Sequence, residues 1–188
     1  MFFKKSNIID DKAVTKAVSE MQKGSAQAFH LLYNKYSQAI YRYCFKLLND
    51  KDLADDAFQE AFIKVYEHRL EFKGANFQSW VYTIAHRTCL NYLRTKKENV
   101  SFEEEYQSPV FESDEDFGAK QFIEKAVAAL PLSLRETLVL REYEECSYQE
   151  IAEILDIDIS LAKVRVHRAR LILRQMLQPL VKEIYESR

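Results

Sequence analysis

Apolar side chains recur along the first half of this chain at steps of three and four residues, the period of one face of an α-helix. From Ser25 onward they fall at Phe29, Leu32, Tyr33, Tyr36, Ile40, Tyr43, Cys44 and Leu47. The same period predicts helices over residues 52–68 and 77–97, with inward positions at Leu53, Ala57, Ala61, Val65, Val81, Ile84, Ala85 and Leu93. Gly74 and Asn76 tolerate a positive φ and predict a loop between them. The pattern predicts a compact helical domain over residues 1–97.

The helical period is lost over residues 98–118 and returns after them. This stretch holds eight acidic residues and no basic ones, so we interpret it as a flexible acidic linker that lacks the apolar content to fold. A further helix is expected over 120–130 and ends at Pro131. Residues 119–188 then form a second small domain. The predicted fold is all-α, with two small helical domains joined by the linker.

Composition supports this fold and narrows the class of protein. Three glycines and three prolines among 188 residues favour long helices over a sheet with many turns. The N-terminus lacks the apolar segment of a signal peptide, and no run approaches the roughly 18 apolar residues of a membrane span, so no membrane insertion is expected. Cys44, Cys89 and Cys146 are odd in number and far apart, which favours small core residues in a reducing cytoplasm.

The net charge of −2 conceals segments of very different charge. Residues 1–97 carry a net charge of +6, the linker −8, and residues 119–188 a net charge of zero. Within the last segment, residues 160–170 gather Lys163, Arg165, Arg168 and Arg170, and no acid occurs from 160 to 179. This basic stretch calls for a functional explanation.

The basic stretch lies in the second of two helices separated by a tight break. Ser147 and Glu150 form a capping-box sequence that opens a short helix with Ile151, Ala152 and Leu155 inward, and Asp158 is a suitable cap for the next helix. In that helix the buried stripe is predicted at Ala162, Val166, Ala169 and Leu173, with Arg165 at its edge. The outward side then carries Lys163, Val164, His167, Arg168 and Arg170. These are the parts of a helix-turn-helix, whose second helix enters the DNA major groove.

A basic helix that merely faces solvent is the alternative interpretation of these charges. The capping box, the tight turn and the small Ala162 and Ala169 on the packing face favour DNA binding. DNA binding also explains the missing acidic residues, because each basic side chain can neutralise a phosphate, whereas an acidic side chain in the groove would repel one.

Taken together, LPLSLRETLVLREYEECSYQEIAEIL and AKVRVHRAR resemble region 4 of bacterial sigma factors of the extracytoplasmic-function group. Independently, DLADDAFQEAFIKVY resembles region 2.2 of this family, and FQSWVYTIAHRTCLNYLR resembles regions 2.3 and 2.4. The resemblance implies a transcription initiation factor that binds core RNA polymerase and reads the minus-35 and minus-10 promoter elements. It also implies contacts with the beta-prime clamp and the beta flap of the polymerase, and an anti-sigma partner.

The second predicted helix has an acidic outward face formed by Asp55, Asp56, Gln59 and Glu60. Acids in a first helical turn are favoured by the helix dipole, but Glu60 lies two turns in and has no such reason. The resemblance implies that this face docks on the beta-prime clamp helices, where a basic partner would relieve the mutual repulsion of the acids. A merely solvated acidic face is the alternative.

The third predicted helix and the loop before it interleave aromatic and basic residues, a mixture suited to single-stranded DNA because bases stack on rings while phosphates meet cations. Phe72 and Tyr82 are expected to be core residues instead. The resemblance implies minus-10 contacts from Lys73, Asn76, Phe77, Trp80, His86, Arg87, Asn91 and Arg94. For the minus-35 element it implies contacts from Arg141, Lys163, Val164, Arg165, His167, Arg168 and Arg170.

Some positions depart from the family pattern. Asp156 and Glu145 stand where the family usually has glycine, so both are expected to adopt a positive φ, which Asp does more easily than Glu. Ser160, Leu161 and Val164 replace the frequent Gly, Thr and Ser of the recognition helix and bear on promoter preference.

Two other classes of function compete with a sigma factor. Scattered histidines, cysteines without metal-ligand spacing and the lack of a phosphate-binding glycine loop argue against an enzyme, a metal site or a cofactor. A dimeric helix-turn-helix regulator with an N-terminal sensing domain is the remaining alternative. It leaves the acidic face and the aromatic, basic third helix unexplained.

Overall fold

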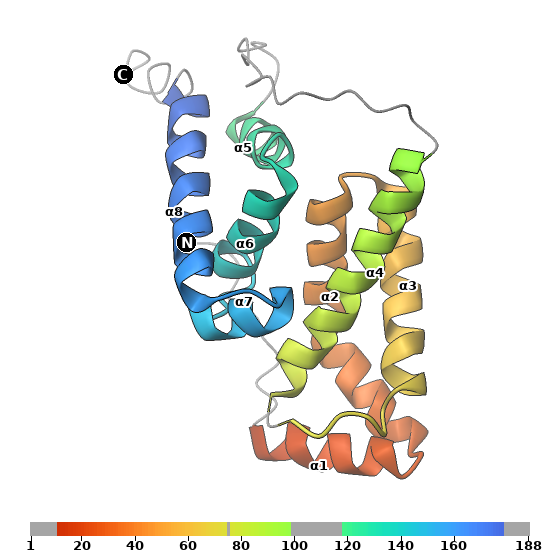
Figure 1. Ribbon diagram of the computed structural model, residues 1–188. Helices are drawn as coiled ribbons and strands as arrows, with labels where there is room; N and C mark the ends of the chain where they lie inside the picture. Colours follow the sequence, from red (N-terminus) through yellow and green to blue (C-terminus); the bar gives the residue numbers. More distant parts are fainter. Residues whose placement is uncertain (1–10, 75, 99–117, 179–188) are drawn as a thin grey trace. The chain divides into compact units, whose positions relative to one another are not determined.

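The computed structural model describes residues 11–74, 76–98 and 118–178, and these contain eight α-helices and no strand (Figure 1). The all-α prediction is confirmed. Packing contacts divide the chain into two units, Met1–Leu93 and Arg94–Arg188, so the division falls inside a helix. The boundaries predicted for the linker, 98 and 118, stay predictions, since residues 99–117 lie outside the described part. No described helix is long and apolar enough to cross a bilayer.

The N-terminal unit contains four helices: α1 (Asp11–Gln22), α2 (Ala26–Leu48), α3 (Lys51–Glu67) and α4 (Phe77–Glu98). Figure 1 shows α1 lying across one end of the other three. Sequence periodicity predicts α2, α3 and α4 but leaves α1 unassigned. Its inward residues Val14, Ala17, Val18 and Met21 are buried. Packing on α2 stabilises this helix of 12 residues, a length that is marginal in isolation.

Short polar side chains begin three of these helices. The Ser25 side chain accepts a hydrogen bond from the Ala28 amide at 3.3 Å and starts α2. Asp50 accepts one from the Leu53 amide at 3.2 Å and starts α3. The Asn76 side-chain oxygen accepts from the Ser79 amide at 3.0 Å, next to the first residue of α4. Each bond satisfies an amide that has no partner within its helix.

Small residues let α3 approach its neighbours closely. Ala54, Ala57 and Ala61 are fully buried on α3, which packs on α2. Leu53, predicted to point inward, is only half-buried, because the stripe is rotated toward Ala54 and Phe62. On α4, Val81 and Ala85 are buried as predicted, whereas Ile84 and Leu93 are half-buried.

The C-terminal unit contains α5 (Ala119–Ala128), α6 (Leu132–Glu142), α7 (Tyr148–Leu155) and α8 (Ile159–Met176). Pro131 separates α5 from α6, where its fixed φ suits the residue before a first helical turn. α8 packs mainly on α6 and α7. Its buried stripe is Ala162, Val166, Ala169 and Met176, whereas Leu173 is half-buried. α7, the tight turn and α8 form the predicted helix-turn-helix.

The turns on either side of α7 have the predicted geometry. The Ser147 side chain accepts from the Glu150 amide at 3.2 Å while the Glu150 carboxylate accepts from the Ser147 amide at 2.7 Å, which completes the capping box. Glu145 and Asp156 have φ values of 55° and 54°, the left-handed conformation expected of them. Asp158 occupies the cap position of α8, but its side chain makes no capping hydrogen bond.

All three cysteines are free and buried, so the prediction of small core residues is confirmed. The Cys44 and Cys89 thiols form a hydrogen bond between α2 and α4. This bond, together with burial, raises the pKa of Cys89 far above its usual range. Burial raises the pKa of Cys146 to about 12. A thiol that stays protonated at neutral pH is a poor nucleophile, which favours a structural role for Cys146 over redox sensing.

Candidate DNA and polymerase interfaces

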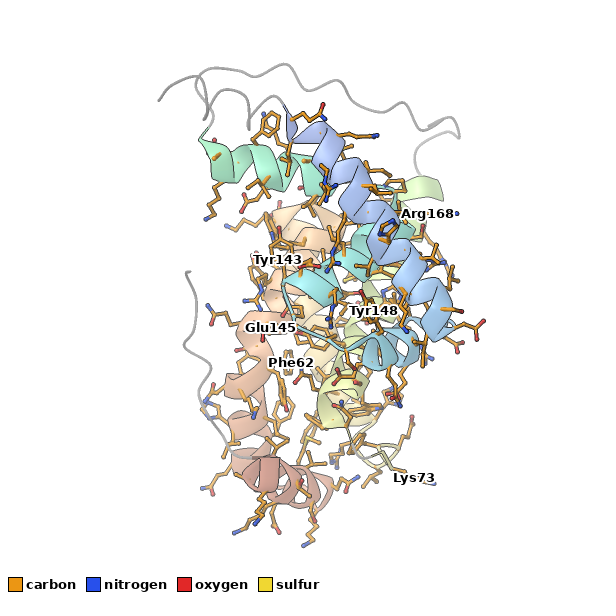
Figure 2. The ribbon with its side chains drawn as sticks, turned by 90° about the vertical axis from the view of Figure 1, so that its left-hand side faces the viewer. Phe62, Lys73, Tyr143, Glu145, Tyr148 and Arg168 are labelled. Carbon is orange, nitrogen blue, oxygen red and sulfur yellow. The ribbon has the colours of Figure 1, made fainter. Side chains whose placement is uncertain are left out.

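The predicted DNA-reading residues of α8 lie on the face opposite the buried stripe. Lys163, Val164, His167, Arg168 and Arg170 are all exposed, and Arg165 is half-buried at the edge. Figure 2 shows Arg168 pointing away from the body of the C-terminal unit. Among the described residues, His167 and Arg168 make no hydrogen bond or ion pair, so both are available to a ligand.

Acids of α6 engage two of the α8 arginines. Arg165 Nη1 lies 3.2 Å from Glu136 Oε1, and Arg170 Nε donates to Glu142 Oε1 at 3.0 Å. Glu136 is buried, and this burial raises its pKa to about 7 although Arg165 and Arg135 oppose the shift. Removing Arg165 would leave a buried carboxylate without this partner, which is costly. Both arginines therefore tie α8 to α6, and sequence spacing alone does not indicate this role.

Arg141 and Lys163 meet at the ring of Tyr148, which Figure 2 labels on α7. The Arg141 guanidinium carbon lies 4.7 Å from the ring centroid and the Lys163 ammonium 5.9 Å from it. Arg141 Nη1 also donates to the Cys146 carbonyl at 2.8 Å, which fixes the bend before α7. Tyr148 thus orients two predicted DNA contacts through cation–π interactions.

On α3, the structure separates the predicted acidic face into exposed and engaged members. Asp56 and Gln59 are exposed, whereas Asp55 and Glu60 are half-buried. Glu60 Oε1 lies 2.6 Å from Lys64 Nζ, and hydrogen bonds to Lys64 and Tyr92 lower its pKa. Burial, together with the hydrogen bond to Glu60, raises the pKa of Tyr92 to about 12. Glu60 therefore links α3 to α4 in addition to lying on the acidic face.

An apolar component of this face escapes the sequence prediction. Ile63 is 57% exposed on α3, one turn after Gln59 and two turns after Asp56. It also lines an open groove of about 540 Å³ together with Phe29, Tyr33, Phe58, Phe62 and Tyr66. The sequence signal that could have identified Ile63 is its spacing of four and seven residues from Gln59 and Asp56, which places it on the same outward side of the helix. The acidic face is thus continuous with an aromatic groove between α2 and α3.

Four predicted minus-10 residues share one outward line of α4. Trp80, Arg87, Asn91 and Arg94 recur at i, i+7, i+11 and i+14, opposite the buried Val81, Ala85 and Cys89. Arg87, Asn91 and Arg94 are exposed, and Trp80 is half-buried. Lys73 is exposed in the loop before α4, as Figure 2 shows. This arrangement gives a partly exposed ring followed by two cationic side chains.

Two other predicted minus-10 residues are buried and present no side chain to DNA in this structure. Phe77 packs against Phe72, Trp80 and Tyr36, with ring centroids 5.4 to 5.7 Å apart. His86 Nδ1 lies 3.0 Å from the Tyr43 hydroxyl oxygen in the core. Tyr82 is buried as expected, whereas Phe72 is half-buried. Asn76 is exposed, but its side-chain oxygen already caps α4.

The burial of His86 predicts that the N-terminal unit loses stability in mild acid. Burial and the neighbouring Arg87 charge lower the His86 pKa from 6.5 to about 4. Above pH 6.5 both states are neutral; as the pH falls toward 4, the unfolded chain takes up a proton that the folded chain excludes. We expect His86 to cost about 2 kcal/mol of unfolding free energy between pH 7 and pH 5. Urea unfolding of the wild type and of His86→Gln at pH 7 and pH 5, followed by the fluorescence of Trp80 in the same unit, measures this loss. The pH dependence of the variant should be smaller by that amount.

Comparison with known protein families decides what these surfaces belong to. Residues 32–98 match the family model of sigma-70 region 2, and residues 121–173 match that of sigma-70 region 4. The RNA polymerase sigma-H factor of Pseudomonas aeruginosa is 33% identical over 88% of this chain and 94% of its own length. The extracytoplasmic-function sigma factor SigW of Bacillus subtilis is 30% identical over 89% of this chain and 98% of its own.

The chain belongs to the extracytoplasmic-function sigma factors. It is therefore a transcription initiation factor that binds core RNA polymerase and directs it to promoters, and the dimeric regulator is not favoured. Proteins of this family initiate transcription without being enzymes. Among the described residues of this sigma factor, no group of three or more His, Cys, Asp or Glu side chains is placed to hold a metal ion.

Two solved structures share the fold. The sigma factor RpoE of Bartonella quintana, determined with the anti-sigma factor NepR, superposes with a TM-score of 0.69 at 24% identity, over 81% of this chain and 98% of that one. CnrH, determined with the cytosolic domain of CnrY, gives a TM-score of 0.68 at 18% identity, over 89% of this chain and 98% of that one. At these identities the likeness concerns the fold.

Proposed function

We propose that this sigma factor divides promoter recognition between its two units. The outward face of α8 reads the minus-35 element, and the outward line of α4 with the Lys73 loop captures the minus-10 strand. The α3 face around Asp56, Gln59 and Glu60 docks on the beta-prime clamp, while the C-terminal unit meets the beta flap. The strongest support for this proposal is the exposed face of α8, which has basic residues and no acidic residue from 160 to 176.

Within the predicted minus-35 set, the contacts of each side chain suggest its role. Lys163, His167 and Arg168 are proposed to meet the DNA directly, because the α6 acids do not hold them. Arg165 and Arg170 are proposed to position α8 on α6, and Arg141 to position Lys163 through Tyr148. In the minus-10 set, the exposed Lys73, Arg87, Asn91 and Arg94 and the half-buried Trp80 form the proposed surface.

Other partners follow from the relatives rather than from contacts in this chain. The sigma factor RpoE, which has this fold, was determined with an anti-sigma factor, and this supports an anti-sigma protein as a partner here. We propose that the chain works in the cytoplasm by binding and without a catalytic step of its own. The acidic linker is proposed to follow the basic channel of the polymerase, although residues 99–117 lie outside the described part.

Run-off transcription tests the proposed function as a whole. Purified chain added to core RNA polymerase should yield transcripts from specific start sites, preceded by shared minus-35 and minus-10 elements. The chain should co-elute with core polymerase and bind promoter duplex poorly alone. Tight binding to an operator without polymerase, with no transcripts from the reconstituted enzyme, would favour a regulator instead.

Strand opening provides a separate test of the α4 surface. The Trp80 ring packs on Phe72 and Phe77 at centroid distances of 5.3 and 5.6 Å and stays partly exposed. Trp80→Ala should weaken opening by about 1 to 3 kcal/mol, the worth of stacking one base on a ring, while polymerase docking stays intact. A permanganate footprint of the minus-10 region measures opening.

Two controls separate stacking from packing in that test. Trp80→Phe keeps a ring and should retain most opening, and a template with a pre-opened bubble should restore transcription by Trp80→Ala. If the pre-opened template gives no rescue, Trp80 serves the core of the N-terminal unit rather than the strand.

A further inference from the structure

Apolar side chains occupy the outward face of α8 among the polar ones. Val164 is 44% exposed and Leu161 39% exposed, although both are large enough to contribute to a core. Val164 points almost directly away from the buried stripe of Ala162, Val166 and Ala169, and Leu161 precedes it by one turn. The recognition helix therefore presents two adjacent apolar side chains to whatever it binds.

Both residues lie where a recognition helix reads bases. α8 begins at Ile159, so Leu161 and Val164 fall in its first two turns. In a helix-turn-helix the N-terminal residues of the second helix contact base edges, while later residues lie nearer the backbone. Leu171 is equally exposed at 44% but lies two turns beyond Val164. Position therefore separates Leu161 and Val164 from Leu171. Ile159, 44% exposed as the first residue of α8, lies nearer the side of Lys163 than that of Val164.

Within the described part of the C-terminal unit, the apolar pair is exposed rather than packed. Ser160, Lys163, His167 and Arg168 surround it, and all four are exposed. Phosphates would be met by cations, so apolar groups contribute nothing to phosphate binding. In the major groove, thymine alone among the four bases presents a methyl group, at C5.

We propose that Leu161 and Val164 determine promoter specificity by contacting the C5-methyl groups of thymines in the minus-35 element. This inference rests on the proposed function of α8 and adds the chemistry that it recognises. Arg168 lies one turn after Val164 on the same stripe, so a guanine or a phosphate next to the thymine is within reach of its guanidinium. The minus-35 element should therefore contain at least one thymine contacted through its methyl group and at least one position contacted by a cationic side chain.

Deoxyuridine tests the proposal, because its base, uracil, differs from thymine only by the absence of that methyl group. The minus-35 element is first selected from a randomised upstream duplex with the reconstituted holoenzyme, and each thymine in it is then replaced singly by deoxyuridine. Loss of one contacted methyl should weaken holoenzyme binding about fourfold, the equivalent of about 0.8 kcal/mol for one buried methyl-sized group. Deoxyuridine placed in the spacer should change nothing.

Variants assign the effect to residues. Val164→Ser and Leu161→Ser remove exposed apolar groups and leave the buried stripe intact. Each should bind deoxyuridine and thymine promoters with nearly equal affinity at the position that it reads. Leu171→Ser is the matched control, because it removes an equally exposed side chain outside the first two turns; it should keep the full fourfold discrimination.

The outcomes separate this inference from the proposed function. A selected element without thymine, or one in which deoxyuridine is tolerated everywhere, overturns methyl reading while minus-35 recognition stands. Discrimination that persists unchanged in both serine variants overturns the assignment to Leu161 and Val164. If the holoenzyme selects no upstream element at all, the proposed function of α8 itself fails.

Discussion

A chain carrying Asp56→Lys and Glu60→Lys is expected to lose its binding to core RNA polymerase. Both residues lie on the α3 face proposed to dock on the beta-prime clamp, where a basic partner surface would face them. Like charges brought together across an interface cost several kcal/mol, so we expect affinity to fall at least about a hundredfold. Co-elution with core polymerase and a fluorescence titration measure the loss.

The surroundings of Glu60 require controls for folding. Glu60 pairs with Lys64 at 2.6 Å and bonds Tyr92, so a lysine there would face Lys64 and weaken the contact with α4. Asp56→Lys alone changes an exposed residue and should still reduce binding. Glu20→Lys reverses an acid on α1 that is half-buried and pairs with Lys23 at the surface, away from α3, and this variant should bind normally. Unchanged binding by folded Asp56→Lys and by the double variant would refute docking through this face.

Replacing Lys163 and Arg168 together by alanine should remove most minus-35 recognition. Each side chain is exposed on the outward side of α8, and each should contribute about 1 to 3 kcal/mol where it reads a base. Transcription from a promoter that depends on its minus-35 element should fall accordingly, while binding to core polymerase stays unchanged. Competition binding of holoenzyme to promoter fragments gives the affinity.

A matched loss of charge elsewhere controls for non-specific electrostatics. Lys120→Ala with Lys125→Ala removes two exposed positive charges from α5 of the same unit and should leave promoter choice intact. Arg165→Ala makes a different comparison, because it strips a partner from the buried Glu136 and should lower the stability of the unit. Wild-type promoter activity in the Lys163 and Arg168 double variant would contradict the proposed role of α8.

Local signals explain why much of the fold was predictable from the sequence. Ser25, the capping box at Ser147 and the three-and-four spacing of apolar residues act within one or two turns, so they are legible without tertiary information. The positive φ of Glu145 and Asp156 was expected from the resemblance to the family pattern, in which glycine is usual at both positions. α1 carries the same spacing but is short, and its packing on α2 completes its stabilisation.

Contacts between residues far apart in sequence account for what the sequence could not predict. His86 meets Tyr43 across 43 positions, and Arg165 meets Glu136 across 29. On a helical wheel His86 borders the polar face of α4, so either exposure or burial fits its position, and the contact with Tyr43 decides between them. The placement of Arg165 and Arg170 against α6 likewise arises only when the helices pack.

Glu145 and Asp156, the left-handed residues on either side of α7, are positions where the stability of this sigma factor can be changed without changing the promoters that it recognises. A side chain in this conformation costs about 1 to 2 kcal/mol, and Glu lacks the local hydrogen bonding that eases the cost for Asp. Glu145→Gly should therefore raise the unfolding free energy by up to about 1 kcal/mol after the added entropy of the unfolded chain, and Asp156→Gly by less. Thermal melts of the two variants would rank them. Neither residue lies on α8, so evolution or design could raise the melting temperature of the factor while leaving the set of promoters that it recognises unchanged.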